Sequence, residues 1–441
     1  MTNIGIVSLG CPKNRVDTEN MLGILGEQGY KIVTDPGDAD VIIVNTCAFI
    51  DSAKEESINT ILEMAEFKNE RCKKIIVAGC LAERYHAEIK EELPEVDAIV
   101  GTGDYHKIAE VIKETLADGS PCLYGHIDDD IPEGLPRVLS TGGASAYLKI
   151  ADGCDNKCTY CVIPQLRGKY RSRPMEDVLE EANALAKDGI KELIVIAQDT
   201  TRYGYDLYGT ETLSKLLTHL SEIDGIRWIR VHYMYPESIT DSMVDVFANN
   251  DKIVKYMDIP IQHINSRILK LMGRKTTREQ IINRLTLLKE RIPDLTIRTS
   301  LIAGFPSETE EEFLELLEFV KTAKFERLGA FAYSKEENTA AAKLANQIDE
   351  DVKIARQNLL LTAQQEISLA AQKAKIGTTV TVLVEGYDEE NLMYYGRTSA
   401  DSIDVDTTTY FAAEDEVAIG SFVTVKILDA DCYDCTGVQI L

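Results

Sequence analysis

The chain of 441 residues has few basic residues for its length. It contains 47 lysines and arginines against 73 aspartates and glutamates, a net charge of -26 at pH 7. So acidic a chain repels nucleic-acid phosphates unless it carries a local basic patch, and it attracts basic partners such as nucleic-acid-binding proteins. The alternative is that the acidity serves only solubility, and composition alone favours that alternative.

Signals for membrane insertion and secretion are missing as well. No apolar run reaches the ~18 residues that a transmembrane helix needs. Residues 1–5 do not form a basic segment followed by an apolar one, so they do not resemble a signal peptide. We therefore expect a cytoplasmic protein whose ten cysteines stay reduced. Reduced and clustered thiolates are more often metal ligands or catalytic groups than structural elements.

The order of apolar runs predicts an α/β protein of several domains. Over the first hundred residues, continuous apolar runs alternate with helical segments, which is typical of a parallel sheet covered on both faces. After residue 146, about six strand–helix units fit a full or partial (β/α) barrel. The strands predicted for this barrel are 146–150, 192–197, 228–231, 256–259, 296–302 and 327–331.

The C-terminal part has a different pattern. Short strands separated by polar turns are predicted at 378–385, 394–398, 403–405 and 422–428, which suits a small β-barrel. Residues 376–441 contain thirteen acidic residues against only Arg397 and Lys426. The expected domains are an N-terminal domain at 1–117, a linker at 118–145, the (β/α) barrel at 146–348, a connecting helix at 349–375 and the β-barrel at 376–441.

Three cysteines lie in one short loop after the first barrel strand. Cys154, Cys158 and Cys161 have C-x3-C-x2-C spacing, so one loop can place three thiolates around one metal centre. A cubane cluster has four irons, and three protein ligands leave one iron open to a substrate or cofactor. Zinc is the main alternative, but a closed structural zinc site needs four ligands. The position of the loop predicts a metal site at the mouth of the barrel.

Three further cysteines lie far apart in the sequence but share one context. Cys11, Cys47 and Cys80 each follow a predicted strand, and the carboxyl ends of parallel strands line one edge of a sheet. Gly10 and Gly79 would let the backbone pass close to a bulky ligand. The alternative is three small core cysteines that end strands by chance. We expect a second metal site here, and we interpret the remaining cysteines as incidental: Cys72, Cys122, and Cys432 and Cys435 in a turn.

Longer stretches around these cysteines resemble the methylthiotransferase family of radical S-adenosylmethionine enzymes. The matching stretches are 10–14, 45–47, 79–81, 146–161, 167–173, 197–200, 258–263 and 304–310, and 396–401 resembles part of a TRAM domain. The resemblance is greatest to the type that modifies the β-carbon of an aspartate in ribosomal protein S-twelve of the small subunit. It implies two four-iron, four-sulfur (4Fe-4S) clusters, an auxiliary one on the three outer cysteines and one on the central three that binds S-adenosyl-L-methionine.

The resemblance also implies the order of the reaction. A 5′-deoxyadenosyl radical removes a hydrogen from the substrate carbon, sulfur comes from the auxiliary cluster, and a second S-adenosylmethionine supplies the methyl group, with electrons from a donor. No acid–base pair is required. Gln198, after the second barrel strand, and Arg298, on a later strand, are expected to contact the cofactor, with structural hydrogen bonding as the equal alternative. Ser307 is expected to cap the helix that follows it.

Two other functions are alternatives to the modification of a ribosomal protein. A sister family methylthiolates an adenosine of transfer RNA with the same clusters. A C-terminal domain that binds RNA should be basic, whereas residues 376–441 are acidic. We therefore expect the ribosomal protein as the partner and no direct contact with nucleic acid. A non-catalytic iron–sulfur scaffold is the second alternative. It would have no use for an open iron or a barrel mouth.

Overall fold

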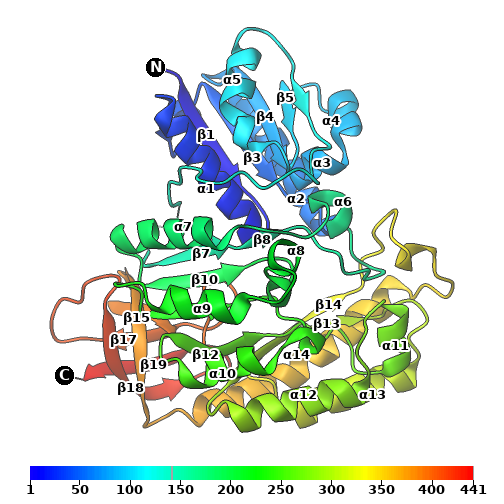
Figure 1. The fold of residues 1–441 in the computed structure, drawn as a ribbon, viewed down its shortest axis with the longest axis vertical. Coiled ribbons are helices and arrows are strands. Elements are labelled where there is room, and N and C mark those ends of the chain that lie inside the picture. The colour runs from blue at the N-terminus through cyan, green and yellow to red at the C-terminus, as the bar shows by residue number, and fades with distance from the viewer. Residues whose placement is uncertain (141–142, 441) are drawn as a thin grey trace.

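The computed structural model describes residues 1–140 and 143–440, which form three domains (Figure 1). The N-terminal domain, blue to cyan in this view, lies above a larger parallel sheet drawn in green to yellow. The small C-terminal barrel, orange to red, packs against one side of that sheet. None of the described helices is long and apolar enough to cross a membrane.

A parallel sheet forms the centre of the N-terminal domain, with strand order β2-β1-β3-β4-β5-β6. Alternate residues of its central strands pack into two separate hydrophobic clusters, Ile42 and Val44 in one and Val41 and Ile43 in the other. Both faces are therefore covered, which confirms the expected architecture. The strands are β1 (Asn3–Ser8), β2 (Lys31–Val33), β3 (Val41–Thr46), β4 (Lys74–Gly79), β5 (Ala98–Val100) and β6 (Cys122–Leu123). The helices are α1 (Pro12–Glu27), α2 (Asp51–Glu66), α3 (Cys80–Arg84), α4 (His86–Glu92) and α5 (Ile108–Leu116).

Strand β6 falls within 118–145, where the sequence predicted only a linker. It consists of two residues that pair with β5, and so short a strand has no hydrophobic period to recognise. The expected linker also includes residues 141–142, and the expected last domain includes residue 441, all of which lie outside the described residues. The expected domain boundaries remain predictions.

The middle domain is a partial barrel of six parallel strands in the order in which they occur along the chain, β7-β10-β11-β12-β13-β14. All six strands predicted for it are confirmed. They are β7 (Ser145–Lys149), β10 (Glu192–Ile196), β11 (Trp228–Val231), β12 (Ile253–Asp258), β13 (Thr296–Ala303) and β14 (Arg327–Ala332). Two short strands, β8 (Ala151–Asp152) and β9 (Arg171–Ser172), form a separate antiparallel pair. The helices are α6 (Ile163–Arg167), α7 (Met175–Lys187), α8 (Tyr205–Tyr208), α9 (Leu213–Ser221), α10 (Asp241–Asn249), α11 (Ser266–Leu271), α12 (Arg278–Arg291) and α13 (Glu310–Ala323).

The start of α13 differs from the prediction that Ser307 caps it. The cap is Thr309, whose hydroxyl accepts a hydrogen bond from the Glu312 amide, while the Glu312 side chain returns to the Thr309 amide. Ser307 instead has a left-handed backbone (φ 68°). The side chain of Glu308 turns back to the Gly304 amide, so the helix begins two residues later than the sequence suggested.

The long helix α14 (Glu350–Lys373) leads into a closed five-stranded barrel. Its strands are β15 (Thr379–Asp388), β16 (Met393–Thr398), β17 (Thr409–Ala412), β18 (Phe422–Ala430) and β19 (Cys435–Ile440). The strand predicted at 403–405 is wrong. This stretch is a turn with a left-handed Asp404 (φ 67°), and it lies against the middle domain, where the hydroxyl of Ser402 is 2.8 Å from His232 Nε2. The closing strand β19 was not predicted.

Candidate metal centres between two sheets

The three outer cysteines meet at the carboxyl edge of the N-terminal sheet. Cys11 caps α1, Cys47 directly follows β3, and Cys80 is the first residue of α3. They follow β1, β3 and β4, which are neighbours in the sheet. Residues at the strand ends also pair, with Ser8 opposite Asn45 and Thr46 opposite Gly79. The structure therefore brings these cysteines to one edge, as the sequence predicted.

Glycine is required at two turns of this edge. Gly10 has φ 84°, and a Cβ atom built on it would lie 2.7 Å from Cys47 Cβ and 3.0 Å from its sulfur. Gly79 has φ 89°, and a Cβ there would overlap the Asn45 side chain. Both positions need a left-handed backbone and have no room for a side chain. Gly10 thus makes space for Cys47 itself, and Gly79 makes space for the end of the neighbouring strand β3.

Polar side chains hold the turns of Cys11 and Cys47 in place. Asn14 Nδ2 donates to the carbonyls of Leu9 (2.8 Å) and Thr46 (3.0 Å), and Asn45 Nδ2 donates to the Asn14 carbonyl (2.9 Å). Ser57 Oγ bonds both the amide and the carbonyl of Cys47. The loops that carry the cysteines are thus tied to one another and to α1 and α2.

Burial makes two of these thiols, those of Cys47 and Cys80, hard to ionise without a metal. It raises the pKa of Cys80 to about 12, against the opposing effect of the Arg167 guanidinium, and the neighbouring Cys11 and Cys47 raise it further. Burial also raises the pKa of Cys47. A metal ligand must be a thiolate, so metal binding here releases protons.

The central cysteines occupy a loop between β8 and α6. Cys154 begins the loop beside the strand pair, and its amide donates to the Gly168 carbonyl (3.1 Å). The Cys161 amide donates to the Cys158 carbonyl (3.2 Å), which closes the second half of the loop. Burial raises the pKa of Cys154 to about 11, with Cys158 among the groups that raise it further. One short loop therefore collects the three thiols.

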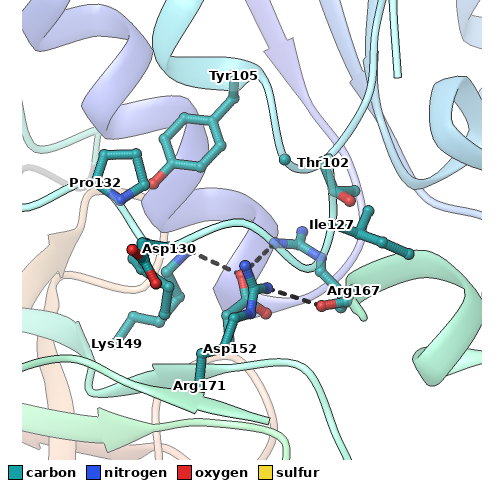
Figure 2. A pocket seen from close by; sticks show the side chains of 11 residues that line it. Thr102, Tyr105, Ile127, Asp130, Pro132, Lys149, Asp152, Arg167 and Arg171 are labelled. Atoms are coloured by element: carbon teal, nitrogen blue, oxygen red, sulfur yellow. Dashed lines mark hydrogen bonds and ion pairs between the residues drawn. The ribbon is translucent and has the colours of Figure 1, made fainter. Parts of the chain in front are cut away.

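A buried charge cluster joins the two cysteine sites. Arg167, which ends α6, lies with Nη1 2.6 Å from Asp17 Oδ2 on α1 and 3.0 Å from Asp152 Oδ2 on β8. Its Nη2 lies 4.0 Å from the sulfur of Cys80. Lys149 binds the same two carboxylates, and Figure 2 shows Lys149 and Arg167 pointing toward Asp152. This cluster attaches the N-terminal domain to the barrel beside both cysteine sites.

The two expected cofactor contacts have different surroundings. Gln198 Nε2 donates to Asp152 Oδ1 (2.7 Å), while its buried Oε1 has no hydrogen-bond partner among the described residues. Arg298 pairs with Asp258 (3.1 Å) and lies 3.8 Å from Asp406 of the C-terminal barrel. Gln198 thus has a free acceptor near the central loop, whereas the contacts of Arg298 are those of the structural alternative. Both assignments remain predictions.

Three residues beside the two cysteine sites could not be identified from the sequence. After β11 the chain places the Tyr235 hydroxyl 3.9 Å from Cys158 Sγ. Two residues earlier, the ring of Tyr233 lies under Lys13, with Nζ 3.1 Å from the ring centroid. Lys13 follows Cys11 by two residues. Because these contacts join distant segments, no local pattern could have predicted them.

A second buried junction ties the same two domains together. The carboxylate of Glu336, in the loop after β14, accepts hydrogen bonds from Lys54 Nζ (3.0 Å) on α2 and Arg84 Nη1 (2.9 Å) on α3. The side chain of Glu336 is 2% exposed. The carboxyl edges of the two sheets are therefore held facing each other at two places.

The donor sets fit clusters better than single ions. Within residues 1–140 and 143–440, no three Cys, His, Asp or Glu side chains converge closely enough to hold one metal ion. A closed zinc site requires such convergence, whereas each thiolate of a cubane binds a different iron. Two sets of three soft thiol donors, each on adjoining turns, are consistent with this requirement.

Comparison with known families divides the chain into three parts. Residues 3–101 match the uncharacterized protein family UPF0004, residues 148–320 match the radical SAM superfamily, and residues 376–440 match the TRAM domain. The structure resembles the radical S-adenosylmethionine methyltransferase TsrM from Kitasatospora setae, solved with cobalamin and a 4Fe-4S cluster. The TM-score is 0.53 at 14% identity, over 75% of this chain and 74% of that one. At this identity the likeness shows the fold alone.

Similarity to curated proteins extends over the whole chain. The chain is 53% identical to the ribosomal protein uS12 methylthiotransferase RimO of Clostridioides difficile, over 99% of this chain and 98% of that protein. It is 50% identical to the protein of the same name from Acetivibrio thermocellus, with the same coverage. The protein of that name from Thermoanaerobacter sp. is 49% identical over 99% of this chain and all of the relative.

Proposed function

The chain belongs to the radical S-adenosylmethionine methylthiotransferase family, and we propose that it adds a methylthio group to the β-carbon of an aspartate of ribosomal protein uS12. The observation that carries this proposal is the identity of about half of all residues, over 99% of the chain, with uS12 methylthiotransferases. The substrate uS12 is the small-subunit protein S-twelve expected from the sequence. The reaction takes place in the cytoplasm and needs an electron donor.

We propose two 4Fe-4S clusters for this reaction. Cys154, Cys158 and Cys161 hold the first together with S-adenosylmethionine, and the outer set of Cys11, Cys47 and Cys80 holds the second. When bound, these groups supply the electron, radical and sulfur chemistry of methylthio transfer. Support comes from the two thiol sets at the facing edges of two sheets.

The chain's own residues position the two sites and exclude water from them. The turns that contain Cys47 and Cys80 are buried, and the cluster of Arg167, Asp17 and Asp152 fixes the distance between the two sites. Asp152 also receives the Gln198 amide, which leaves Gln198 Oε1 free for a donor on the cofactor. Because the positioning groups are buried and mutually bonded, they need little rearrangement when the substrate arrives.

The C-terminal barrel supports a basic protein as the partner. Its exposed acids include Glu389, Glu390, Glu414, Asp415 and Glu416. Its two basic residues are Arg397 on β16, which is buried, and Lys426 on β18, which is exposed. Such a surface repels RNA and attracts a positively charged protein. Direct binding of nucleic acid is therefore not part of this proposal.

One anaerobic experiment tests the function. The protein is reconstituted with iron and sulfide, and dithionite, S-adenosylmethionine and either uS12 or transfer RNA are added, with both products read by mass spectrometry. We expect a gain of about 46 mass units on one aspartate, from replacement of H by SCH3. The gain should vanish in Cys154→Ala and in Cys11→Ala but persist in Cys72→Ala, a buried cysteine outside both sets. Modified RNA with unmodified uS12 would move the chain to the RNA-modifying relatives.

A further inference from the structure

Lys13 is a buried cation without a counter-ion. Only 6% of the surface of Lys13 is exposed. Among the described residues, no carboxylate lies within 4.0 Å of its Nζ, and its Nζ donates no hydrogen bond. The ring of Tyr233, 3.1 Å away, is its stabilising contact. A cation–π contact is weaker than a buried ion pair, so this ammonium group retains the capacity to bind an anion.

The acidic groups around Lys13 are already engaged. Asp258 accepts hydrogen bonds from Arg298 Nη1 (3.1 Å) and from the Tyr233 amide (3.2 Å). Asp152 is bound by Arg167 and Lys149 of the buried charge cluster. Neither carboxylate is therefore available to pair with Lys13.

Lys13 lies close to segments that carry ligands of both cysteine sets. It follows Cys11 by two residues at the start of α1, and it lies on the ring of Tyr233. The same segment after β11 carries Tyr235, whose hydroxyl is 3.9 Å from Cys158. Tyr233 has a left-handed backbone (φ 58°), and its backbone N–H donates a hydrogen bond to Asp258 Oδ2 (3.2 Å). The ammonium group thus lies beside the outer cysteine set, on the segment whose Tyr235 reaches the central set. A substrate carbon on which both sets act must lie near this segment.

We propose that Lys13 binds the side-chain carboxylate of the aspartate that the enzyme modifies, and so selects aspartate over neutral side chains. This inference rests on the proposed function. A carboxylate that enters a buried site needs a cation to replace its water, and a charge-assisted hydrogen bond to an ammonium group supplies it. An asparagine in the same place would leave Lys13 unpaired, and unpaired buried groups give strong discrimination. Holding the carboxylate also fixes the adjacent β-carbon.

Binding measurements separate this role from others. Fluorescence anisotropy gives the affinity of labelled uS12 and of uS12 with its target aspartate changed to asparagine, without S-adenosylmethionine or reductant. Proteins with and without iron are compared for wild type, Lys13→Met, Lys13→Arg and the control Arg15→Met. Arg15 is a cation on the same helix that pairs with Asp404 at the surface. Because iron-free proteins are included, loss of iron from a variant does not prevent the comparison.

We expect wild type to bind the aspartate form about 10- to 100-fold more tightly than the asparagine form. Lys13→Met should lose this preference, while Lys13→Arg and Arg15→Met keep it. Release of 5′-deoxyadenosine in the absence of uS12 is measured for the same four proteins. Equal binding of both forms by wild type, or a preference that survives in Lys13→Met, overturns the proposal.

Other outcomes have separate meanings. If Lys13→Met loses 5′-deoxyadenosine release without uS12, Lys13 serves the cofactor and the proposal is wrong. If wild type modifies transfer RNA and leaves uS12 unmodified, the proposed function fails whatever Lys13 does. If wild type modifies uS12 while Lys13→Met keeps both rate and preference, only the role of Lys13 fails.

Discussion

Replacing Glu192 by glutamine should loosen the attachment of the C-terminal barrel. Glu192 begins β10 and is fully buried, with Oε1 2.8 Å from Arg230 Nε and Oε2 2.6 Å from Arg397 Nη2. Arg230 is also fully buried and has no other ion pair among the described residues. The change Glu192→Gln preserves shape but leaves Arg230 without a counter-ion, which costs about 3–5 kcal/mol.

The pKa of Glu192 leads to a similar value for the contribution of this carboxylate to stability. Burial opposes its ionisation, but the guanidinium groups of Arg397 and Arg230 outweigh burial and lower the pKa from 4.5 to about 2. By linkage, a depression of this size contributes about 3 kcal/mol. This stability is fully present above the ordinary pKa of 4.5 and is lost as the pH falls toward 2. The loss of stability that Glu192→Gln causes should therefore stay constant from pH 8 to pH 5. It should become smaller only below about pH 4.5.

Hydrogen exchange followed by mass spectrometry measures the effect domain by domain, because a three-domain chain does not unfold in two states. Exchange should accelerate at the interface, in β15, β16 and β10. The matched control is Glu385→Gln, which removes the other acidic partner of Arg397 but from a side chain that is 18% exposed, and it should cost at most about 1 kcal/mol. If Glu192→Gln is no more harmful than Glu385→Gln, the buried pair does not hold this interface and the reasoning is refuted.

Two further changes test the region of the cysteines. Gly10→Ala forces a side chain against Cys47 at φ 84° and should reduce iron to about half of wild type by emptying the outer site, whereas Gly26→Ala, a helical position with open space, should bind iron normally. Normal iron in Gly10→Ala would contradict this reading of the turn. Arg167→Met should cost about 1.5–3 kcal/mol and accelerate exchange in α1, because it removes one of the two cations that two buried carboxylates share and leaves them only Lys149. The control Arg171→Met should change exchange little, and equal effects of the two variants would count against the buried cluster.

Local patterns were enough for much of the fold. All six barrel strands were predicted because buried parallel strands are continuous apolar runs between helices. The errors fell where tertiary contacts outweigh local preference. The stretch 403–405 has strand-like residues but turns to dock on the middle domain, and β19 follows a polar turn that hides its start at Cys435. At Ser307 the side chain of the following glutamate turned backward and delayed the helix.

The sequence by itself determined which residues form the candidate sites. The spacing of the central cysteines and the shared strand-end position of the outer ones identified both sets, because a short loop and the end of an apolar run can each be recognised in the local sequence. Only the tertiary structure decided that the two edges face each other, through Arg167 and Glu336. It also placed Lys13 on the ring of Tyr233, with no ion pair among the described residues. Such placements depend on contacts between distant segments, and the pairing or isolation of a buried charge is settled only once the domains have packed.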